Sequence, residues 1–150
     1  MRLTRVELGD GRELLHFDDD DAPERSTKDL RDLDPRGEAP NLRQDPLLDE
    51  WISVAAARLD RTFLPAVDKC PLCPSSDGHL TEIPSDDYDV VVFENRFPSY
   101  TGLRVETTGG GRFGQHPAWG RCEVVCFTPD HESSFAALDV DRARLVVEAW

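Results

Sequence analysis

The stretch Arg121–Phe127 reads RCEVVCF, and its β-branched and aromatic residues favour a buried β-strand. Two other short runs have the same character: Glu50–Ala55 reads EWISVA, and Tyr88–Phe93 reads YDVVVF. Proline and glycine separate these runs, as they do in chains that turn between short strands. We therefore expect a core that is largely β.

A β-hairpin is expected at the N-terminus. The strand-like residues 3–8 and 13–17 flank Gly9-Asp10-Gly11, and glycine is favoured in tight turns that need a positive φ. Residues 18–41 follow and are rich in charge and proline, so we expect a linker or mobile arm there. The arm begins with the tract Asp18–Asp21, which lacks the ligand spacing of a calcium loop and is expected to be solvated.

A helix is expected at the other end of the chain. Asp139 is a candidate N-cap, with Asp141 in the first helical turn. The apolar residues that recur at helical spacing are Val140, Ala143, Val147 and Trp150. No glycine or asparagine stop signal follows them, so we expect the chain to be part of a longer one.

Composition narrows the class of protein. The chain has 150 residues, with 17 Lys and Arg against 30 Asp and Glu, which gives a net charge of −13. This acidity argues against a nucleic acid or an anionic membrane as the main partner. There is no apolar run of membrane-spanning length and no apolar leader at residues 1–7, so we expect a cytoplasmic protein.

The most specific local motif is Cys70-Pro71-Leu72-Cys73. Two thiolates separated by two residues can turn toward one metal ion, and soft sulfur ligands suit zinc. Half of a zinc site is the favoured interpretation, with a redox pair and two thiols without a ligand as the alternatives. The redox interpretation is disfavoured because Pro74 follows the motif where that chemistry needs a helix.

Two more ligands would complete a zinc site. The candidates by residue type are Cys122, Cys126, His16, His79, His116 and His131. On a strand that rises about 3.3 Å per residue, Cys122 and Cys126 would lie about 13 Å apart, so at most one could share the ion. We expect both to be buried thiols. His131 follows a proline turn at the strand end, where it could reach an ion or simply lie at the surface.

Anion and nucleotide contacts have weaker signals. Arg58 and Arg61 are the candidate phosphate contacts, with surface ion pairs as the alternative. Residues 93–98 could frame a base or ribose, or could be an ordinary strand end and turn. Residues 109–114 match the glycine pattern of dinucleotide-binding proteins, but Pro117 opposes the helix that this pattern requires. We expect a loop there.

Five motifs in a fixed order resemble one protein family. They are DPLLDEW at 45–51, Arg58 with Arg61, the Cys70 and Cys73 pair, VFENRF at 92–97 and CFTPDH at 126–131. In this order they resemble the N-terminal half of the galactose-1-phosphate uridylyltransferase family, over residues 42–150. Residues 1–41 lie outside the motifs, and we expect them to form an N-terminal hairpin with an acidic, partly mobile arm.

The resemblance implies an α+β fold of the histidine-triad-like type, in which helices pack against an antiparallel sheet. In this chain the fold would be incomplete after the first long helix. The resemblance also implies a reaction of galactose metabolism, in which UMP moves between UDP-glucose and galactose 1-phosphate through a covalent uridylyl-histidine. Full-length members are expected to be homodimers.

The resemblance assigns site residues by position. Three ligands of a structural zinc ion (Zn2+) match Cys70, Cys73 and His131. Positions that line the uridine pocket match Leu72, Phe93, Asn95, Phe97 and Val124. Positions near the phosphates match Arg58 and Arg61. Arg96 stands where other members carry aspartate, so it is assigned no ribose contact.

One expected motif is missing. A His-Pro-His segment, which the resemblance places beyond Trp150, would provide the nucleophilic histidine and the fourth zinc ligand. His116 is not a substitute, because it is followed by Pro117 and Ala118. We therefore expect residues 1–150 to be inactive alone, because the covalent intermediate needs a neutral imidazole in line with the α-phosphate. A zinc-stabilised binding module without catalysis and a sugar-nucleotide phosphorylase of the same superfamily are the alternatives.

Overall fold

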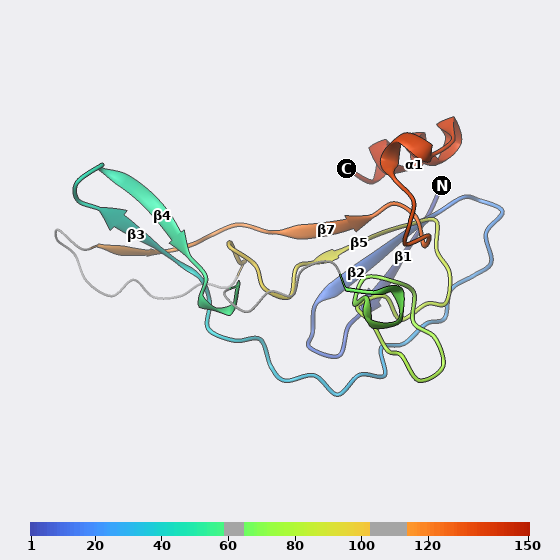
Figure 1. Cartoon of the computed structure of the whole chain (residues 1–150), viewed down its shortest axis with the longest axis horizontal. Helices are drawn as coiled ribbons and strands as arrows, with labels where there is room; N and C mark the ends of the chain where they lie inside the picture. The colour runs from blue at the N-terminus through green and yellow to red at the C-terminus, as the bar shows by residue number, and fades with distance from the viewer. Residues whose placement is uncertain (59–64, 103–113) are drawn as a thin grey trace. The chain divides into compact units, whose positions relative to one another are not determined.

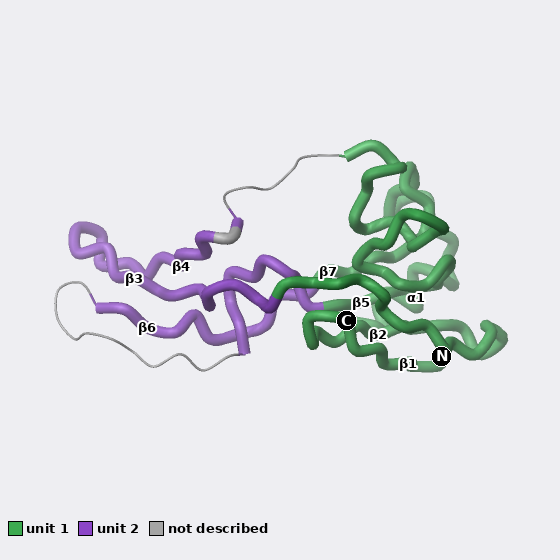
Figure 2. Tube along the Cα trace, turned by 90° about the horizontal axis from the view of Figure 1, so that it is seen from below, with its two compact units in different colours: residues 1–34, 62–93, 124–150 green, residues 35–61, 94–123 purple. Residues whose placement is uncertain are grey.

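The computed structural model describes residues 1–58, 65–102 and 114–150 (Figure 1). Arg61 and residues 109–113 of the glycine-rich segment lie outside the described residues. The chain divides into two compact units (Figure 2). Unit 1 comprises Met1–Asp34, Thr62–Phe93 and Val124–Trp150, and unit 2 comprises Pro35–Arg61 and Glu94–Glu123.

A four-stranded sheet with the order β1-β2-β5-β7 forms the centre of unit 1. Its strands are β1 (Arg2–Glu7), β2 (Glu13–Asp18), β5 (Val90–Glu94) and β7 (Glu123–Cys126). β1 and β2 pair antiparallel, and Gly11 in their turn has a φ of 78°, which glycine adopts without steric cost. The predicted hairpin is therefore confirmed, as are the strands predicted within 88–93 and 121–127.

The central strand β5 is buried on both of its faces. Alternate residues of a strand point to opposite faces, so its consecutive apolar residues fill two separate clusters. The first cluster consists of Val6, Leu8, Leu14, Ile83, Tyr88, Val91 and Phe93. The second cluster consists of Phe17, Val90, Val92, Leu145 and Val146.

The helix α1 (Val140–Ala149) closes the second cluster through Leu145 and Val146. The Oδ1 atom of Asp139 accepts a hydrogen bond from the backbone N–H of Arg142 at 2.7 Å, which confirms the predicted N-cap. The Arg142 side chain donates to Asp89 at 2.6 Å, so the first turn is also tied to the loop that precedes β5.

Unit 2 contains a three-stranded antiparallel sheet with the order β4-β3-β6. Its strands are β3 (Asn41–Asp45), β4 (Glu50–Val54) and β6 (Gln115–Pro117). β4 was expected, whereas β3 and β6 were not, because both are short and polar. Pro117 is accommodated because β6 lies at the edge of the sheet, where a residue without an N–H leaves no ladder partner unsatisfied.

Residues 19–40 contain no helix or strand, yet the side chains of Arg25 and Asp29 fasten this segment to unit 1. Arg25 forms a bidentate ion pair with Asp18 at 2.6 and 2.7 Å. The carboxylate of Asp29 accepts a hydrogen bond from the backbone N–H of Gly9 at 2.9 Å. The expectation that Asp18 is solvated was wrong, because Arg25 neutralises this aspartate in a fully buried position.

The described residues thus form an α+β arrangement of two antiparallel sheets and one short helix. The remaining helical segments are single 3-10 turns: η1 (Ala56–Arg58), η2 (Val67–Lys69) and η3 (Phe135–Ala137). Within the described ranges, no helix has the length and apolar character needed to span a membrane.

Candidate metal centre

The motif Cys70–Cys73 forms a tight loop in unit 1. The turn η2 ends at Lys69 with Cys70 as its C-cap, and the backbone N–H of Cys73 donates to the carbonyl of Cys70 at 3.4 Å. This turn brings the two thiols to one side of the loop. Cys70 is buried and Cys73 is half-buried, so the pair lies at the surface of the core.

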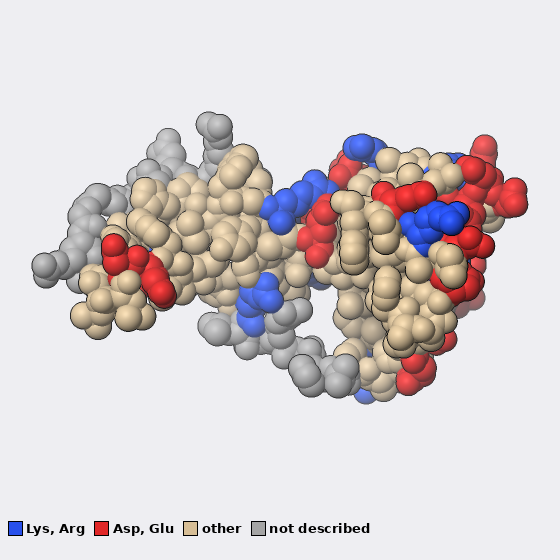
Figure 3. All heavy atoms as spheres, turned by 90° about the horizontal axis from the view of Figure 1, so that it is seen from above, with Lys and Arg blue, Asp and Glu red and all other residues tan. Residues whose placement is uncertain are grey.

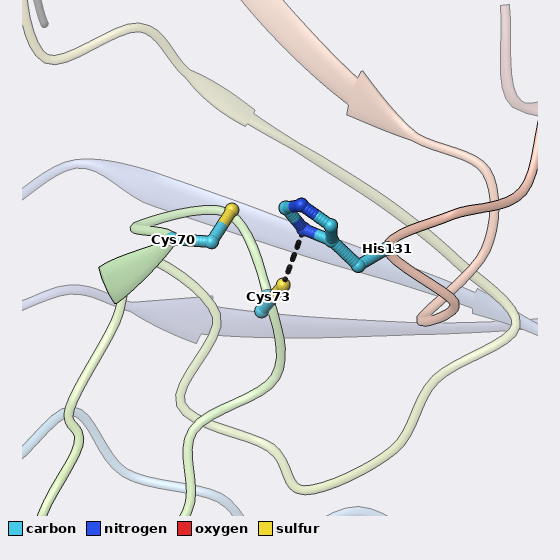
Figure 4. Close-up of side chains that lie close together, drawn as sticks. All are labelled: Cys70, Cys73 and His131. Carbon is cyan, nitrogen blue, oxygen red and sulfur yellow. Dashed lines mark hydrogen bonds between the residues drawn. The ribbon is translucent and has the colours of Figure 1, made fainter. Parts of the chain in front are cut away.

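His131 reaches the two thiols from the loop that follows β7 (Figure 4). Its Nδ1 lies 3.2 Å from the Sγ of Cys73. The loop is held in part by Tyr88, a buried residue whose hydroxyl donates to the carbonyl of Thr128 at 2.6 Å. The sequence placed His131 only at a strand end, and the structure brings it to the cysteine pair.

The three side chains lie close enough together to hold a metal ion. The two Sγ atoms and the imidazole nitrogen all lie within 4.8 Å of one another. Tetrahedral zinc at about 2.3 Å from sulfur and about 2.0 Å from nitrogen requires ligand atoms roughly 3.5 to 4 Å apart, so the group fits with small adjustments. In the part of the chain that the structure describes, it is the one such group of three or more His, Cys, Asp or Glu side chains.

The protonation of the thiols couples metal binding to pH. Burial, followed by the neighbouring Cys70, raises the pKa of Cys73 to about 11. Both thiols cannot readily ionise side by side unless a cation compensates their charge. A divalent ion that binds here must therefore displace protons from the cysteines, which makes the affinity for the metal fall at low pH.

The other candidate ligands lie outside this group. His79 donates from Nε2 to the carbonyl oxygen of Cys70 at 3.2 Å, so it contacts the backbone of the loop and not the ligand atoms. His116 lies in unit 2, where its ring centroid is 4.6 Å from that of Trp51. Cys122 and Cys126 are half-buried, which corrects the expectation that both are buried.

His16 is fully buried in β2 and has a separate role. Its Nε2 lies 3.5 Å from the Ser85 hydroxyl, and its Nδ1 has no hydrogen-bond partner among the described residues. Burial, and then the charge of Arg25, lower the pKa of His16 to about 4 against the opposing effect of Asp18. The folded protein therefore holds this imidazole neutral at neutral pH.

We predict that His16 makes the protein sensitive to acid. Because the imidazole takes up a proton near pH 6.5 in the unfolded chain and only near pH 4 in the folded protein, stability is lost as the pH falls between these values. The loss amounts to at most about 3 kcal/mol. Urea unfolding at several pH values would measure it, and His16→Gln should flatten the slope in this window; equal slopes would contradict the prediction.

The predicted uridine-pocket residues of unit 1 have different surroundings. Phe93 is almost fully buried in the first core cluster, and Val124 packs against that cluster. Leu72, between the two cysteines, is 40% exposed. Of these three residues, Leu72 alone is a large apolar side chain exposed to solvent.

In unit 2 the structure brings Asn95 and Phe97 together. The Oδ1 of Asn95 accepts a hydrogen bond from the backbone N–H of Phe97 at 2.9 Å, and the guanidinium of Arg96 lies 5.7 Å from the Phe97 ring centroid. Arg58 donates to the Ser99 hydroxyl at 2.8 Å. Ser99 was not predicted, because a serine in a turn carries no distinctive sequence signal.

Comparison with known proteins gives consistent matches. Residues 30–150 match the family model described as "Galactose-1-phosphate uridyl transferase, N-terminal domain". The galactose-1-phosphate uridylyltransferase of Streptomyces lividans is 45% identical over 150 residues, which are 100% of this chain and 38% of that protein. The enzyme of that name from Thermotoga maritima is 38% identical over 111 residues, covering 73% of this chain and 33% of the relative.

A solved structure agrees with these matches. A chain described as "Structure of uridylyltransferase" superimposes with a TM-score of 0.56 at 29% identity, covering 73% of this chain and 33% of that chain. The present chain therefore spans about a third of the length of the relatives that it matches.

Proposed function

The chain belongs to the galactose-1-phosphate uridyl transferase family, as part of the N-terminal domain, and from this we propose that it is the zinc-holding front section of an enzyme that moves UMP between UDP-glucose and galactose 1-phosphate. The observation that carries the proposal is the convergence of Cys70, Cys73 and His131, which lie in three of the positions that the family resemblance assigns to zinc. The proposed fold of the complete enzyme is histidine-triad-like.

Zinc is the proposed metal because two sulfurs and one imidazole nitrogen are the ligands that it prefers. Bound there, zinc would tie the loop 70–73 to the loop that carries His131. This linkage favours a structural metal over a redox pair, since a redox dithiol has no use for a third ligand. A ligand from outside residues 1–150, or a water molecule, would complete the tetrahedron.

Substrate contacts are proposed for the residues that the family positions assign. Arg58 and Arg61 would bind the phosphates, because a guanidinium can hold a phosphate through two hydrogen bonds. The uridine would contact Leu72, Phe93, Asn95, Phe97 and Val124. On the face shown in Figure 3, acidic side chains gather over unit 1, which argues against a nucleic acid as the partner.

The proposed reaction passes through a uridylyl-histidine. Residues 1–150 contain no His-Pro-His segment to supply the nucleophile, so we propose that these residues alone do not catalyse the transfer. We further propose that residues 42–150 form the section common to the family and that residues 1–41 are an N-terminal addition. The family model begins at residue 30, which supports an N-terminal section outside the common domain. Homodimerisation and a cytoplasmic location remain predictions.

Nucleotide binding tests the proposal. Isothermal titration of the protein with UDP-glucose should give saturable binding that is at least 10-fold weaker in Arg58→Ala, because a hydrogen bond to a charged group contributes about 1.5 to 3 kcal/mol. Arg43→Ala is the matched control: it removes an exposed arginine of the same unit whose side chain, among the described residues, bonds locally to Asn41. Its affinity should match that of the wild type.

Other outcomes of this titration would identify the alternatives. Equal affinities for ADP-glucose and UDP-glucose would favour a sugar-nucleotide phosphorylase. Zinc content without any nucleotide binding would favour a zinc-stabilised binding module, and the uridylyltransferase assignment for this chain would then be wrong.

A further inference from the structure

The cysteine loop is held from outside by two neighbouring residues of the following segment. The backbone N–H of Glu82 donates to the carbonyl of Pro71 at 2.9 Å, and Pro71 lies between the two cysteines. The hydroxyl of Thr81 donates to the carbonyl of Cys73 at 2.6 Å. Both residues are buried, so these bonds are shielded from water and fix the loop at the two places that set the direction of the thiols.

Glu82 is itself held by two arginines from the N-terminal part of the chain. One carboxylate oxygen pairs with Arg31 at 2.9 Å, and the other accepts a hydrogen bond from Arg12. Arg12 is fully buried and the Glu82 side chain is only 10% exposed. Charges desolvated to this degree are costly unless their partners stay in place, so the position of Glu82 is well defined.

The two arginines are fixed in turn by their own carboxylates. Asp10 pairs with Arg12 at 2.7 Å, and Asp29 pairs with Arg31 at 2.8 Å. The Arg31 segment also approaches the hairpin turn closely: a Cβ on Gly9 would meet the carbonyl oxygen of Arg31 at 2.8 Å. The result is a buried chain of alternating charge that runs from the hairpin turn and residues 29–31 to the segment behind the cysteine loop.

We propose that Glu82 is a positioning residue for the metal centre, through which the N-terminal residues Asp10–Arg12 and Asp29–Arg31 raise its affinity for zinc. Glu82 does not contact the ion. It holds Pro71 in place through its backbone N–H. The thiols therefore have less conformational freedom to lose when zinc binds. The inference rests on the proposed zinc site. It adds a function for residues 1–31, most of which precede the part of the chain that matches the family model.

The zinc affinity of Glu82→Gln tests this inference. We expect competition with a chromophoric chelator to show zinc binding at least 10-fold weaker than in the wild type, which is the usual effect of losing a group that orients metal ligands. We also expect the cobalt-substituted variant to show altered thiolate charge-transfer bands. Val146→Ala is the control, because it removes packing from the second core cluster of the same unit without a bond to the loop. It should destabilise the protein yet keep the wild-type affinity and spectrum.

The outcomes separate this inference from the zinc site itself. If wild-type protein holds zinc, and Glu82→Gln loses stability but keeps the affinity and the cobalt spectrum, the positioning role is wrong and the zinc site stands. If the wild type holds no zinc, both are wrong. Should Glu82→Gln fail to fold, Arg31→Ala replaces it, since Arg31 contacts Glu82 but no residue of the loop through its side chain. The same 10-fold loss is expected, and an unchanged affinity would overturn the inference.

Discussion

Cys70→Ser will leave the purified protein without stoichiometric zinc and will lower its thermal stability. A serine hydroxyl does not ionise near neutral pH, so the substitution removes one of three clustered ligands, and the remaining two cannot hold the ion tightly. Binding to the folded state alone contributes about 4 kcal/mol when free zinc is 1,000 times its dissociation constant. Elemental analysis gives the zinc content, and thermal unfolding with and without a chelator gives the stability.

Cys122→Ser is the matched control for this experiment. Cys122 is a half-buried free cysteine that lies outside the metal-ligand group, so this variant should retain wild-type zinc and respond to the chelator as the wild type does. Wild-type zinc content in Cys70→Ser, or an equal loss in both variants, would show that the proposed ligands are wrong.

Elements with strong local signals were predictable from the sequence. The first hairpin follows from Gly9-Asp10-Gly11 between two apolar runs, and α1 follows from the Asp139 cap and the helical spacing behind it. β5 was predicted because it is buried on both faces and therefore apolar at consecutive positions. In each case, the residues that determine the element lie within it or directly beside it.

β3 and β6 could not be predicted in this way. β6 has three residues, of which only Gln115 and His116 can donate from the backbone, and its identity as a strand comes from pairing with β3 more than 70 residues earlier. Asp18 shows the same limitation for burial. Its position in a run of four aspartates indicates a solvated tract, and only the path of residues 19–25, which brings Arg25 back to Asp18, makes a buried site possible.

The candidate metal centre was predictable in part. The spacing of Cys70 and Cys73 indicates two ligands that can face one ion, but local sequence left His131 open between a ligand and a surface residue, and the family resemblance singled it out. The buried ion pairs behind the cysteine loop could not be predicted from any sequence pattern. Arg12 and Glu82 are 70 residues apart, and charged residues at such positions are solvated far more often than buried.

We predict a loss of about 3 to 5 kcal/mol in the free energy of unfolding for Arg12→Met. The guanidinium of Arg12 is fully buried between Asp10 and Glu82, and a methionine of similar length would leave both carboxylates without this partner in a region closed to water. Equilibrium urea unfolding measures the effect. As a control, Arg5→Ala removes an arginine that is 69% exposed and paired with Glu13, so its cost should stay below about 1 kcal/mol.

A double substitution distinguishes a lost ion pair from lost packing. If Arg12→Met is costly because it removes one of the two arginines that neutralise the Glu82 carboxylate, then adding Glu82→Gln removes that charge and should restore part of the stability, with a coupling of about 1 to 3 kcal/mol. If packing were the cause, the two costs would add. If Arg12→Met lowers the free energy of unfolding no more than Arg5→Ala does, the prediction is wrong. Water would then have to solvate the two carboxylates in place of the guanidinium, and the site would not be closed to water.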